Sequence, residues 1–513
     1  MNDERLSYRF GPLERRGLLG PVRLGQAGAV GGALALGIEL LDRLGGGLGV
    51  VAAMLLLAAA VALTTVPLAG RTAEQWAPIG WAFAARTLSG RRQFRSRAPL
   101  AGAIAPSEQI LDLPRELRDV KLVTIEHDGR AIGALAERRG RLLIAVLACR
   151  ALSFALLDPE VQERRLAQWG TVLAASANAP IRRLQWIERT APAQGDELAR
   201  WLHAARDPSL PPRGTPIVES YLELIGQTTQ ITHDHEILLA VQFDTARLRG
   251  KSELIAEQIL EQVSHVARGL EAAEIQVLGA LSGGQLARVL RTAYDPYARA
   301  ELALQDAAGA GQSPPAAREP GPAGTGPPGT GQPGPGQAPL SPHSAGPVGA
   351  TETWDHYRSD GALHATYWIS GWPKVGVSPM FMDALLAESS AVRTVAVTFE
   401  PVPPERSARE VEAAITRDRA DSELRRRFGQ SETARQRQAQ DAAARREAEL
   451  AAGHGEVRLA GFVTVSGRDE GELRRACAEI HRHAARSRLE LRRMYGQQAE
   501  AFSFTLPLAR GLR

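Results

Sequence analysis

The stretch LGGGLGVVAAMLLLAAAVALTTVPLAG, from Leu44 to Gly70, contains no charged side chain. A helix of roughly 20 mostly apolar residues is long enough to cross the hydrocarbon core of a bilayer. The segment from Leu48 to Leu68 meets this requirement. The sequence therefore predicts a transmembrane helix at this position, and the fold has to be arranged around it.

A second apolar run, LGQAGAVGGALALGIELL, precedes the first from Leu24 to Leu41. Its polar residues Gln26 and Glu39 lie near its ends, and a turn with Asp42, Arg43 and three glycines separates the two runs. The pattern predicts a transmembrane helical hairpin over residues 24–70, after a polar arm of residues 1–23. A cleaved signal peptide is the alternative, which the paired runs and their length disfavour.

Arginine is concentrated outside the hairpin rather than in its turn. The flanking arginines are Arg5, Arg9, Arg15, Arg16 and Arg23 before it, and Arg71, Arg86, Arg91, Arg92, Arg95 and Arg97 after it. Only Arg43 lies in the turn. Because positive residues stay on the cytoplasmic side, the sequence predicts a multi-pass protein of the inner (cytoplasmic) membrane with both termini in the cytoplasm.

Small residues recur along the first run. Gly28 and Gly32 form a G-x-x-x-G pattern, and Ala33 and Gly37 keep the same spacing. Small residues allow two helices to approach closely in lipid. We expect these positions to pack either against the second helix of the hairpin or against another subunit, which includes a second copy of the chain.

The basic segment 71–100 follows the hairpin and contains QWAPIGWAFAARTLSG. Aromatic and basic side chains together are typical of the lipid headgroup layer. Residues 74–88 are therefore predicted to form a helix on the membrane surface, with Trp76, Trp81 and Phe83 at the interface. A helix of the protein core is the alternative.

Length and composition indicate several domains and few chemical specialisations. The chain has 513 residues and a formal net charge of +4, and lysine occurs only at positions 121, 251 and 374. Basic residues are not interleaved with aromatic ones as in proteins that bind single strands, so direct contact with nucleic acid is not expected. Cys149 and Cys477 lie in apolar patterns and are predicted to be buried, reduced thiols.

Residues 101–306 have the pattern of a first α+β lobe. Strands are predicted at 120–127, 140–149, 181–189, 236–243 and 275–281, and helices after Asp158, at 196–205, at 216–225, after Ser252 and after Ser282. Residues 307–350 are almost entirely Pro, Gly, Ala, Ser, Gln and Thr, which predicts a disordered linker.

Residues 351–513 repeat this order as a second α+β lobe. Strands are predicted at 364–372, 391–401, 457–465, 489–495 and 502–508, helices at 379–386 and after Asp469, and a charged helical insert at 407–452 that Ser407 caps. Each lobe has an order that suits a split βαβ, ferredoxin-like unit.

Two motifs resemble nucleotide-binding sequences. Gly250-Lys251-Ser252 follows a strand and opens a helix, but the P-loop pattern requires glycine where the chain has Thr245. Residues 281–285 spell LSGGQ, the signature of ABC-transporter ATPases, but it acts only with a P-loop and a second acidic motif. Helix caps explain both motifs better, and no cofactor site is predicted.

Histidines occur in two pairs, His233 with His235 and His481 with His483. A zinc site needs three or four converging ligands, so no metal site is predicted. No spacing of Ser, Cys, Asp or Glu indicates a catalytic group, and the sequence predicts a protein that is not an enzyme.

Several segments resemble the N-terminal region of the CagE/TrbE-type transfer ATPases of type IV secretion and conjugation. They are PVPPER (401–406), EAELA (447–451), LAGFVTVSGRDEGELRRA (459–476) and AFSFTLPLARG (501–511), with LSGGQLARVLRTAYDP as a looser match. The arm RFGPLERRG and the hairpin resemble the small PrgI/TrbD-type membrane proteins of actinobacterial conjugation loci. The resemblance implies a docking half of such a motor, fused to a membrane anchor and lacking the P-loop motor domain.

A non-enzymatic membrane scaffold follows from the resemblance. Its expected partners are the lipid bilayer, a separate P-loop transfer ATPase and other subunits of the secretion apparatus. A structural component of a type VII secretion system, of the EccE kind, is one alternative. A membrane-tethered enzyme that binds nucleotide through Lys251 is the alternative of another class.

Overall fold

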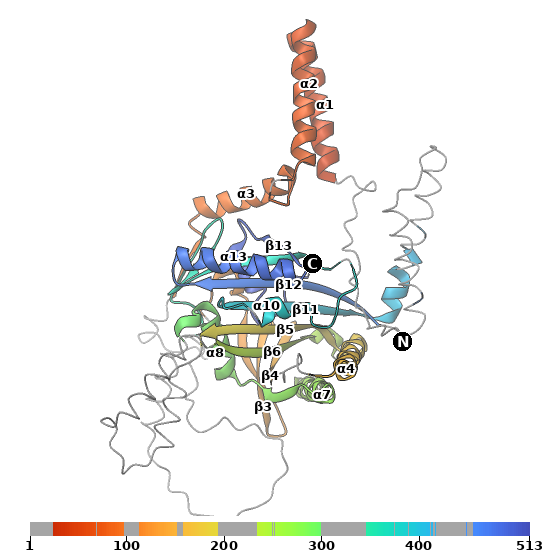
Figure 1. Ribbon diagram of the computed structural model, residues 1–513, viewed down its shortest axis with the longest axis vertical. Coiled ribbons are helices and arrows are strands. Elements are labelled where there is room, and N and C mark those ends of the chain that lie inside the picture. The colour runs from red at the N-terminus through yellow and green to blue at the C-terminus, as the bar shows by residue number, and fades with distance from the viewer. Residues whose placement is uncertain are drawn as a thin grey trace, which may run out of the picture.

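The computed structural model describes residues 24–67, 69–96, 112–150, 157–192, 233–248, 252–298, 345–373, 375–387, 389–410 and 455–512, with a few single positions between them. Its main helices are α1 (Leu24–Leu44), α2 (Gly46–Thr65), α3 (Ala73–Leu88), α4 (Pro159–Asn178), α7 (Ser252–Ala272), α8 (Gly283–Tyr294), α10 (Asp383–Leu386), α13 (Glu470–Arg486) and α14 (Gln498–Ser503). Figure 1 shows α1 and α2 as a hairpin that rises from a body built on one sheet.

Thirteen described strands form this sheet, and the pairings among them are antiparallel. The strands are β1 (Gln93–Arg95), β2 (Lys121–His127), β3 (Arg130–Glu137), β4 (Leu142–Arg150), β5 (Ile181–Pro192), β6 (His233–Asp244), β7 (Gln276–Ala280), β8 (Gly349–Glu352), β9 (Tyr357–Ser359), β10 (Ala362–Gly371), β11 (Arg393–Val402), β12 (Glu456–Gly467) and β13 (Glu490–Arg493). The main order is β1-β8-β9-β10-β12-β11-β5-β6-β4-β3-β2.

The same local order occurs in each half of the chain. In the first half, β4 pairs with β7 and β6, and β6 pairs with β5. In the second half, β10 pairs with β13 and β12, and β12 pairs with β11. The edge strands β5 and β11 then pair with each other from Arg393 opposite Thr190 to Phe399 opposite Leu184. The halves are therefore joined in one sheet, and the prediction of two separate lobes is not confirmed.

Helices cover the two faces of the sheet differently. On one face, α7 packs over the first half and α4 over the junction of β5 and β11, around one apolar cluster, and α10 and α13 pack over the second half around another. The apolar face of α7 is buried at Ile259, Val263, Val266 and Leu270, as the helical spacing predicts. On the other face, α8 and α14 share a single core with apolar residues from both halves. This shared core joins the halves in addition to the strand pairing.

The C-terminal segment, residues 504–512, crosses the shared face over the junction of the halves. The fully buried Gln185 of β5 donates to the Phe504 carbonyl (2.7 Å) and accepts from the backbone N–H groups of Leu508 (3.1 Å) and Ala509 (2.7 Å). Gln242 of β6 donates to the Leu508 carbonyl at 3.0 Å. The strand predicted at 502–508 is wrong, because these residues hydrogen-bond to side chains of the sheet after the short helix α14.

Several predicted elements differ from the observed ones. β3, a strand in which half of the residues are Ala or Gly, was not expected, and β8 begins at Gly349, inside the predicted linker 307–350. The predicted cap at Ser407 is wrong, because the helical residues begin at position 404 and Ser407 therefore lies inside the first turn. Its hydroxyl donates to the Glu456 carboxylate of β12. The helices predicted at 196–205 and 216–225 and most of the insert 407–452 lie outside the described residues.

The predicted pair of membrane spans is also wrong. Within the part of the chain that the structure describes, only α2 is long and apolar enough to cross a membrane, judged by length and composition. The helix α1 is rich in glycine and carries Glu39, Asp42 and Arg43, which are costly to bury in lipid. A multi-pass protein with both termini in the cytoplasm is therefore not supported, because the orientation argument needs a second span.

Candidate functional site at the foot of the hairpin

The helices α1 and α2 form a closely packed antiparallel pair whose outer surface is apolar. They are joined at Gly45, whose φ of 57° is a left-handed conformation that glycine adopts readily. A Cβ added at Gly37 would lie 3.5 Å from the Ala53 Cβ, whereas nothing lies within 4 Å of one added at Gly28 or Gly32. Of the three glycines predicted to pack helices, Gly37 thus lies in the contact within the hairpin, and the other two lie on its outside.

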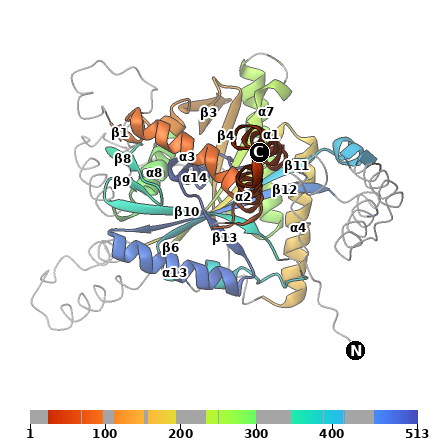
Figure 2. The same cartoon turned by 90° about the horizontal axis from the view of Figure 1, so that it is seen from above.

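The foot of the hairpin is where α1, α2 and α3 meet. Gln26 of α1 donates to the Thr64 carbonyl of α2 at 2.8 Å, which fixes the ends of the two helices side by side. The helix α3 begins after Thr72, whose backbone N–H donates to the Gln75 side chain at 3.3 Å. Figures 1 and 2 show α3 running across the body from this point, at a wide angle to the hairpin.

One face of α3 is held on the body by aromatic contacts. The ring centroid of Trp354, in the turn between β8 and β9, lies 5.8 Å from Trp76 and 5.1 Å from Phe83. Trp76 also lies 6.1 Å from the ring of Tyr495. Such ring pairs add roughly 0.5–1.5 kcal/mol each beyond the burial of area. Two of the three predicted interface residues therefore contact the protein, whereas Trp81 is 79% exposed.

An ion pair reinforces these aromatic contacts. The Arg86 guanidinium of α3 donates to the Glu352 carboxylate at 3.1 Å and to the Gly496 carbonyl at 2.5 Å. Glu352 also accepts from the backbone N–H of Ala499 at 3.2 Å. Burial raises the pKa of Glu352, and the charge of Arg86 opposes this change. The ion pair thus ties α3 both to the sheet and to the start of α14.

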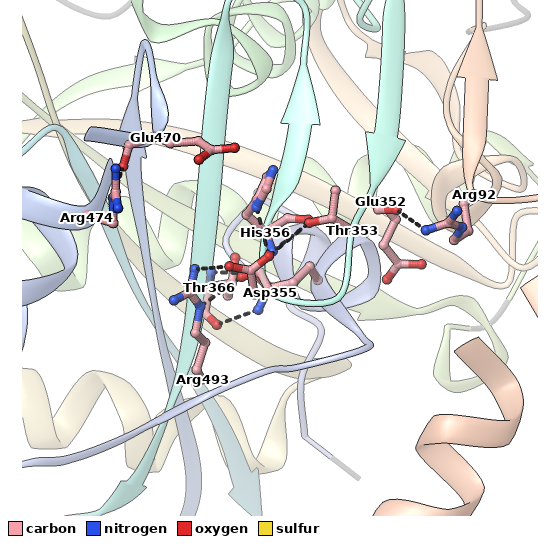
Figure 3. Close-up of polar contacts among 10 residues, drawn as sticks. Arg92, Glu352, Thr353, Asp355, His356, Thr366, Glu470, Arg474 and Arg493 are labelled. Carbon is pink, nitrogen blue, oxygen red and sulfur yellow. Dashed lines mark hydrogen bonds and ion pairs between the residues drawn. The ribbon is translucent and has the colours of Figure 1, made fainter. Parts of the chain in front are cut away.

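The turn between β8 and β9 is itself held in place by polar contacts (Figure 3). Asp355 accepts from Thr353 at 3.2 Å and lies 2.9 Å from the ring of His356, and Arg493 donates to the Asp355 carbonyl at 2.8 Å. Burial raises the pKa of Asp355, but His356 and Arg493 outweigh this effect, so the pKa is lowered overall. These contacts fix the position of Trp354, on which α3 rests.

The opposite face of α3 is exposed and has no charged side chain. Its residues follow helical spacing and are Ala77, Pro78, Trp81, Ala82, Ala84, Ala85 and Leu88. Leu88 is 89% exposed. Because the other face rests on the body, this outer face of α3 points away from the body, toward the side from which the hairpin rises (Figure 1). An apolar face of this kind suits a lipid surface.

A cleft of about 770 Å³ lies beside the foot, between Gly70, the end of β13 and α13. Its lining includes Cys477, Tyr367 and His481. Burial raises the pKa of the Cys477 thiol, which disfavours the nucleophilic thiolate. Burial and the neighbouring Arg493 lower the pKa of His481. The Cys477 side chain in this cleft is therefore held mainly as the neutral thiol.

One of the two sequence motifs that resemble nucleotide sites, LSGGQ, forms the cap of a helix. Ser282 caps α8 with a reciprocal pair of bonds to Gln285, since its N–H donates to the Gln285 side chain at 2.8 Å and its hydroxyl accepts from the Gln285 N–H at 3.4 Å. Gly283 lies against Gly133 of β3. A Cβ added at Gly133 would lie 2.5 Å from the Gly283 nitrogen, so the two backbones can approach this closely only with glycine at position 133. The prediction that a helix cap explains LSGGQ is confirmed. Lys251 lies outside the described residues.

The described histidine and cysteine side chains contact other protein groups or are buried. His235 lies 3.4 Å from Glu188, and the ring of His481 contacts that of Tyr367 with centroids 4.9 Å apart. Among the described residues, no three His, Cys, Asp or Glu side chains converge as metal ligands. Both cysteines are buried and free, as predicted, and burial raises the pKa of Cys149 to about 12.

Three residues that hold α3 in place were not predicted from the sequence, namely Trp354, Glu352 and Tyr495. The only signal in the sequence was the tryptophan in the polar segment TETWDHY, because a large ring in a polar segment indicates a buried contact rather than a solvated turn.

No protein-family model matches the chain, and a search of the curated proteins found no match either.

Proposed function

We propose that the protein is a non-enzymatic scaffold that α2 fixes to a lipid bilayer and that presents its sheet to a separate transfer ATPase of a secretion or conjugation apparatus. One observation supports the membrane part of the proposal. The exposed apolar surface of α2 continues into the charge-free outer face of α3, and α3 is tied to the body. A monomeric soluble protein rarely exposes so large an apolar surface.

We further propose that the body is a fusion of two split βαβ units. The order β7-β4-β6-β5 in the first half and β13-β10-β12-β11 in the second have the same connections along the chain. Each order is that of a ferredoxin-like unit with four strands and two crossing helices. A body built from two such units in one continuous sheet suits a docking role.

The proposed partner follows from the sequence resemblance to the N-terminal region of the transfer ATPases. The sheet stacks its strands away from the hairpin, so that the first half lies farther from the hairpin than the second (Figure 1). A body of this shape would offer a motor protein a surface at a distance from the bilayer. The charged insert 407–452 is a further candidate contact.

The membrane attachment can be tested with Leu55→Asp. Leu55 lies near the middle of α2 and is 66% exposed. A carboxylate at the centre of a membrane helix costs about 2.5–3.5 kcal/mol. After an alkaline wash, we therefore expect the wild type to remain in the membrane fraction and the variant to be released from it. Leu254→Asp, at a 50% exposed leucine of α7, is the matched control and should stay with the membrane. Recovery of the wild type as a soluble protein would contradict the proposal.

The partner can be tested by purification in mild detergent through a C-terminal tag. We expect a P-loop ATPase encoded near the gene to co-purify with the full chain. The Leu55→Asp variant, extracted in the same detergent, should still bind the ATPase, because the proposed docking surface lies on the sheet. Isolation of the chain alone under these conditions would count against the docking role.

A further inference from the structure

A cleft of about 670 Å³ lies between the C-terminal half of α3 and the C-terminal segment. It is lined by six arginines from separate parts of the chain, namely Arg86, Arg91, Arg115, Arg138, Arg183 and Arg510. Four glutamates also line it, so the lining keeps an excess of positive charge. This cleft is distinct from the one beside Gly70, and the two clefts share no lining residue.

Three of these arginines have carboxylate partners. Arg86 pairs with Glu352 (3.1 Å), Arg183 with Glu400 (2.7 Å) and Arg510 with Glu137 (2.9 Å). Their side chains are only 12–22% exposed, so they form the fixed wall of the cleft.

The other three, Arg91, Arg115 and Arg138, are exposed. Within the described residues, none of these three has a carboxylate within ion-pair distance. They come from the end of α3, the segment before β2 and the turn after β3. The fold thus brings three guanidinium groups without carboxylate partners to the lining of one cavity, where an anion could bind them together.

A neighbouring group responds to this positive charge. Burial lowers the pKa of Arg182, and repulsion by Arg183 and Arg138 lowers it further. Burial is the largest of these effects, and Glu400 and Asp244 oppose the repulsion by the two arginines.

The cleft also adjoins the outer face of α3. Ala82 and Ala85 belong to that apolar face, and both line the cleft. If this face of α3 lies on a bilayer, the side of the cleft that α3 forms adjoins the lipid headgroups. A bound phosphate would then be reached from the membrane rather than from bulk solvent.

We infer that this cleft binds the phosphate headgroup of an anionic lipid, through Arg91, Arg115 and Arg138. The inference rests on the proposed membrane attachment and adds the class of lipid and the residues that select it. Guanidinium groups form forked hydrogen bonds with phosphate oxygens, and a zwitterionic headgroup would be disfavoured by its own cation.

The test is native mass spectrometry of the full chain in detergent with phosphatidylglycerol or phosphatidylcholine of identical acyl chains. We expect preferential retention of phosphatidylglycerol. A triple variant with Arg91→Gln, Arg115→Gln and Arg138→Gln should bind it roughly 100-fold more weakly, since each basic residue at an anionic surface contributes about 1 kcal/mol. The matched control changes the exposed Arg268, Arg358 and Arg482 to Gln, which removes the same charge elsewhere and should leave lipid binding unchanged.

The outcomes separate the inference from the proposed function. Equal retention of both lipids by a chain that stays with membranes would overturn the inference and leave the membrane scaffold standing. Loss of the chain from membranes would instead contradict the scaffold. Displacement of the lipid by inorganic phosphate at equal affinity would assign the cleft to free phosphate. Displacement by short duplex DNA would assign it to nucleic acid. Either result would overturn the lipid inference.

Discussion

Replacing Phe502 by alanine is expected to lower the free energy of unfolding by about 4 kcal/mol, because a large buried ring leaves both lost contacts and a cavity. Phe502 is 3% exposed and belongs to α14 in the second half of the chain. Its ring centroid lies 5.1 Å from Tyr294 in the first half, 5.3 Å from Tyr357 and 4.8 Å from His364. The cavity would therefore open in the core that both halves share.

Hydrogen exchange can show whether the halves lose stability together. In Phe502→Ala, the amides of β6 and β12 should lose protection to the same degree, because the β5–β11 pairing and the shared core couple them. Trp81→Ala, at an exposed ring, is the control and should change the stability by less than about 0.5 kcal/mol. A loss of protection in β12 alone would show that the two halves are independent lobes after all.

The second large effect is a loss of stability between pH 6.5 and pH 4 that depends on His364. This side chain is fully buried in the same core, with Nδ1 2.8 Å from the Ser466 hydroxyl and Nε2 2.8 Å from the Ser359 hydroxyl and 3.0 Å from the Tyr294 carbonyl. Burial lowers the pKa of His364 to about 4, although the Tyr294 carbonyl and Asp360 oppose the change. The folded protein therefore keeps the ring neutral.

The sign follows from the protons bound in each state. Between pH 4 and pH 6.5 the unfolded chain, with a histidine pKa of about 6.5, binds a proton that the folded chain does not. The contribution of His364 is complete above pH 6.5, falls as the pH drops, and levels off below about pH 4. A difference of roughly 2.5 pKa units corresponds to about 3 kcal/mol.

Urea unfolding at pH 7 and pH 4.5 measures this effect. His364→Gln keeps hydrogen-bonding groups but cannot titrate, so its stability should fall less than that of the wild type between the two pH values. His265→Gln, at an exposed histidine of α7, should keep the full fall. Equal pH dependence in wild type and His364→Gln would rule out a buried neutral His364 as its source.

Much of the body could be predicted because its signals are local. Alternating apolar residues mark β5, and the cap of α13 follows from Asp469, whose carboxylate accepts from the Glu472 N–H at 2.8 Å. Pro159 after Asp158 marks the start of α4. β3 was not predicted, because its segment RAIGALAE has few β-branched residues and resembles a turn or helix as closely as a strand.

The arrangement at the foot of the hairpin depends on contacts between distant residues. Trp354 meets Trp76 and Phe83 across more than 260 positions, and no periodicity in either segment records this. The same aromatic residues suit both a headgroup layer and a protein contact, so composition alone could not distinguish them. The glycines of α1 are similarly ambiguous, because small residues allow helices to pack closely in water as well as in lipid, and of the three only Gly37 contacts α2.

The antiparallel register across β5 and β11 also has a mechanical consequence. In Figure 1 the strands run across the direction of the hairpin, so a pull on the far half, away from α1 and α2, would act nearly along the N–H···O axes of this ladder. Seven residue pairs, from Arg393 and Thr190 to Phe399 and Leu184, would share that load at once. The C-terminal segment, bonded to Gln185 of the first half and to Thr398 of the second at 3.0 Å, would act as a tie across the joint.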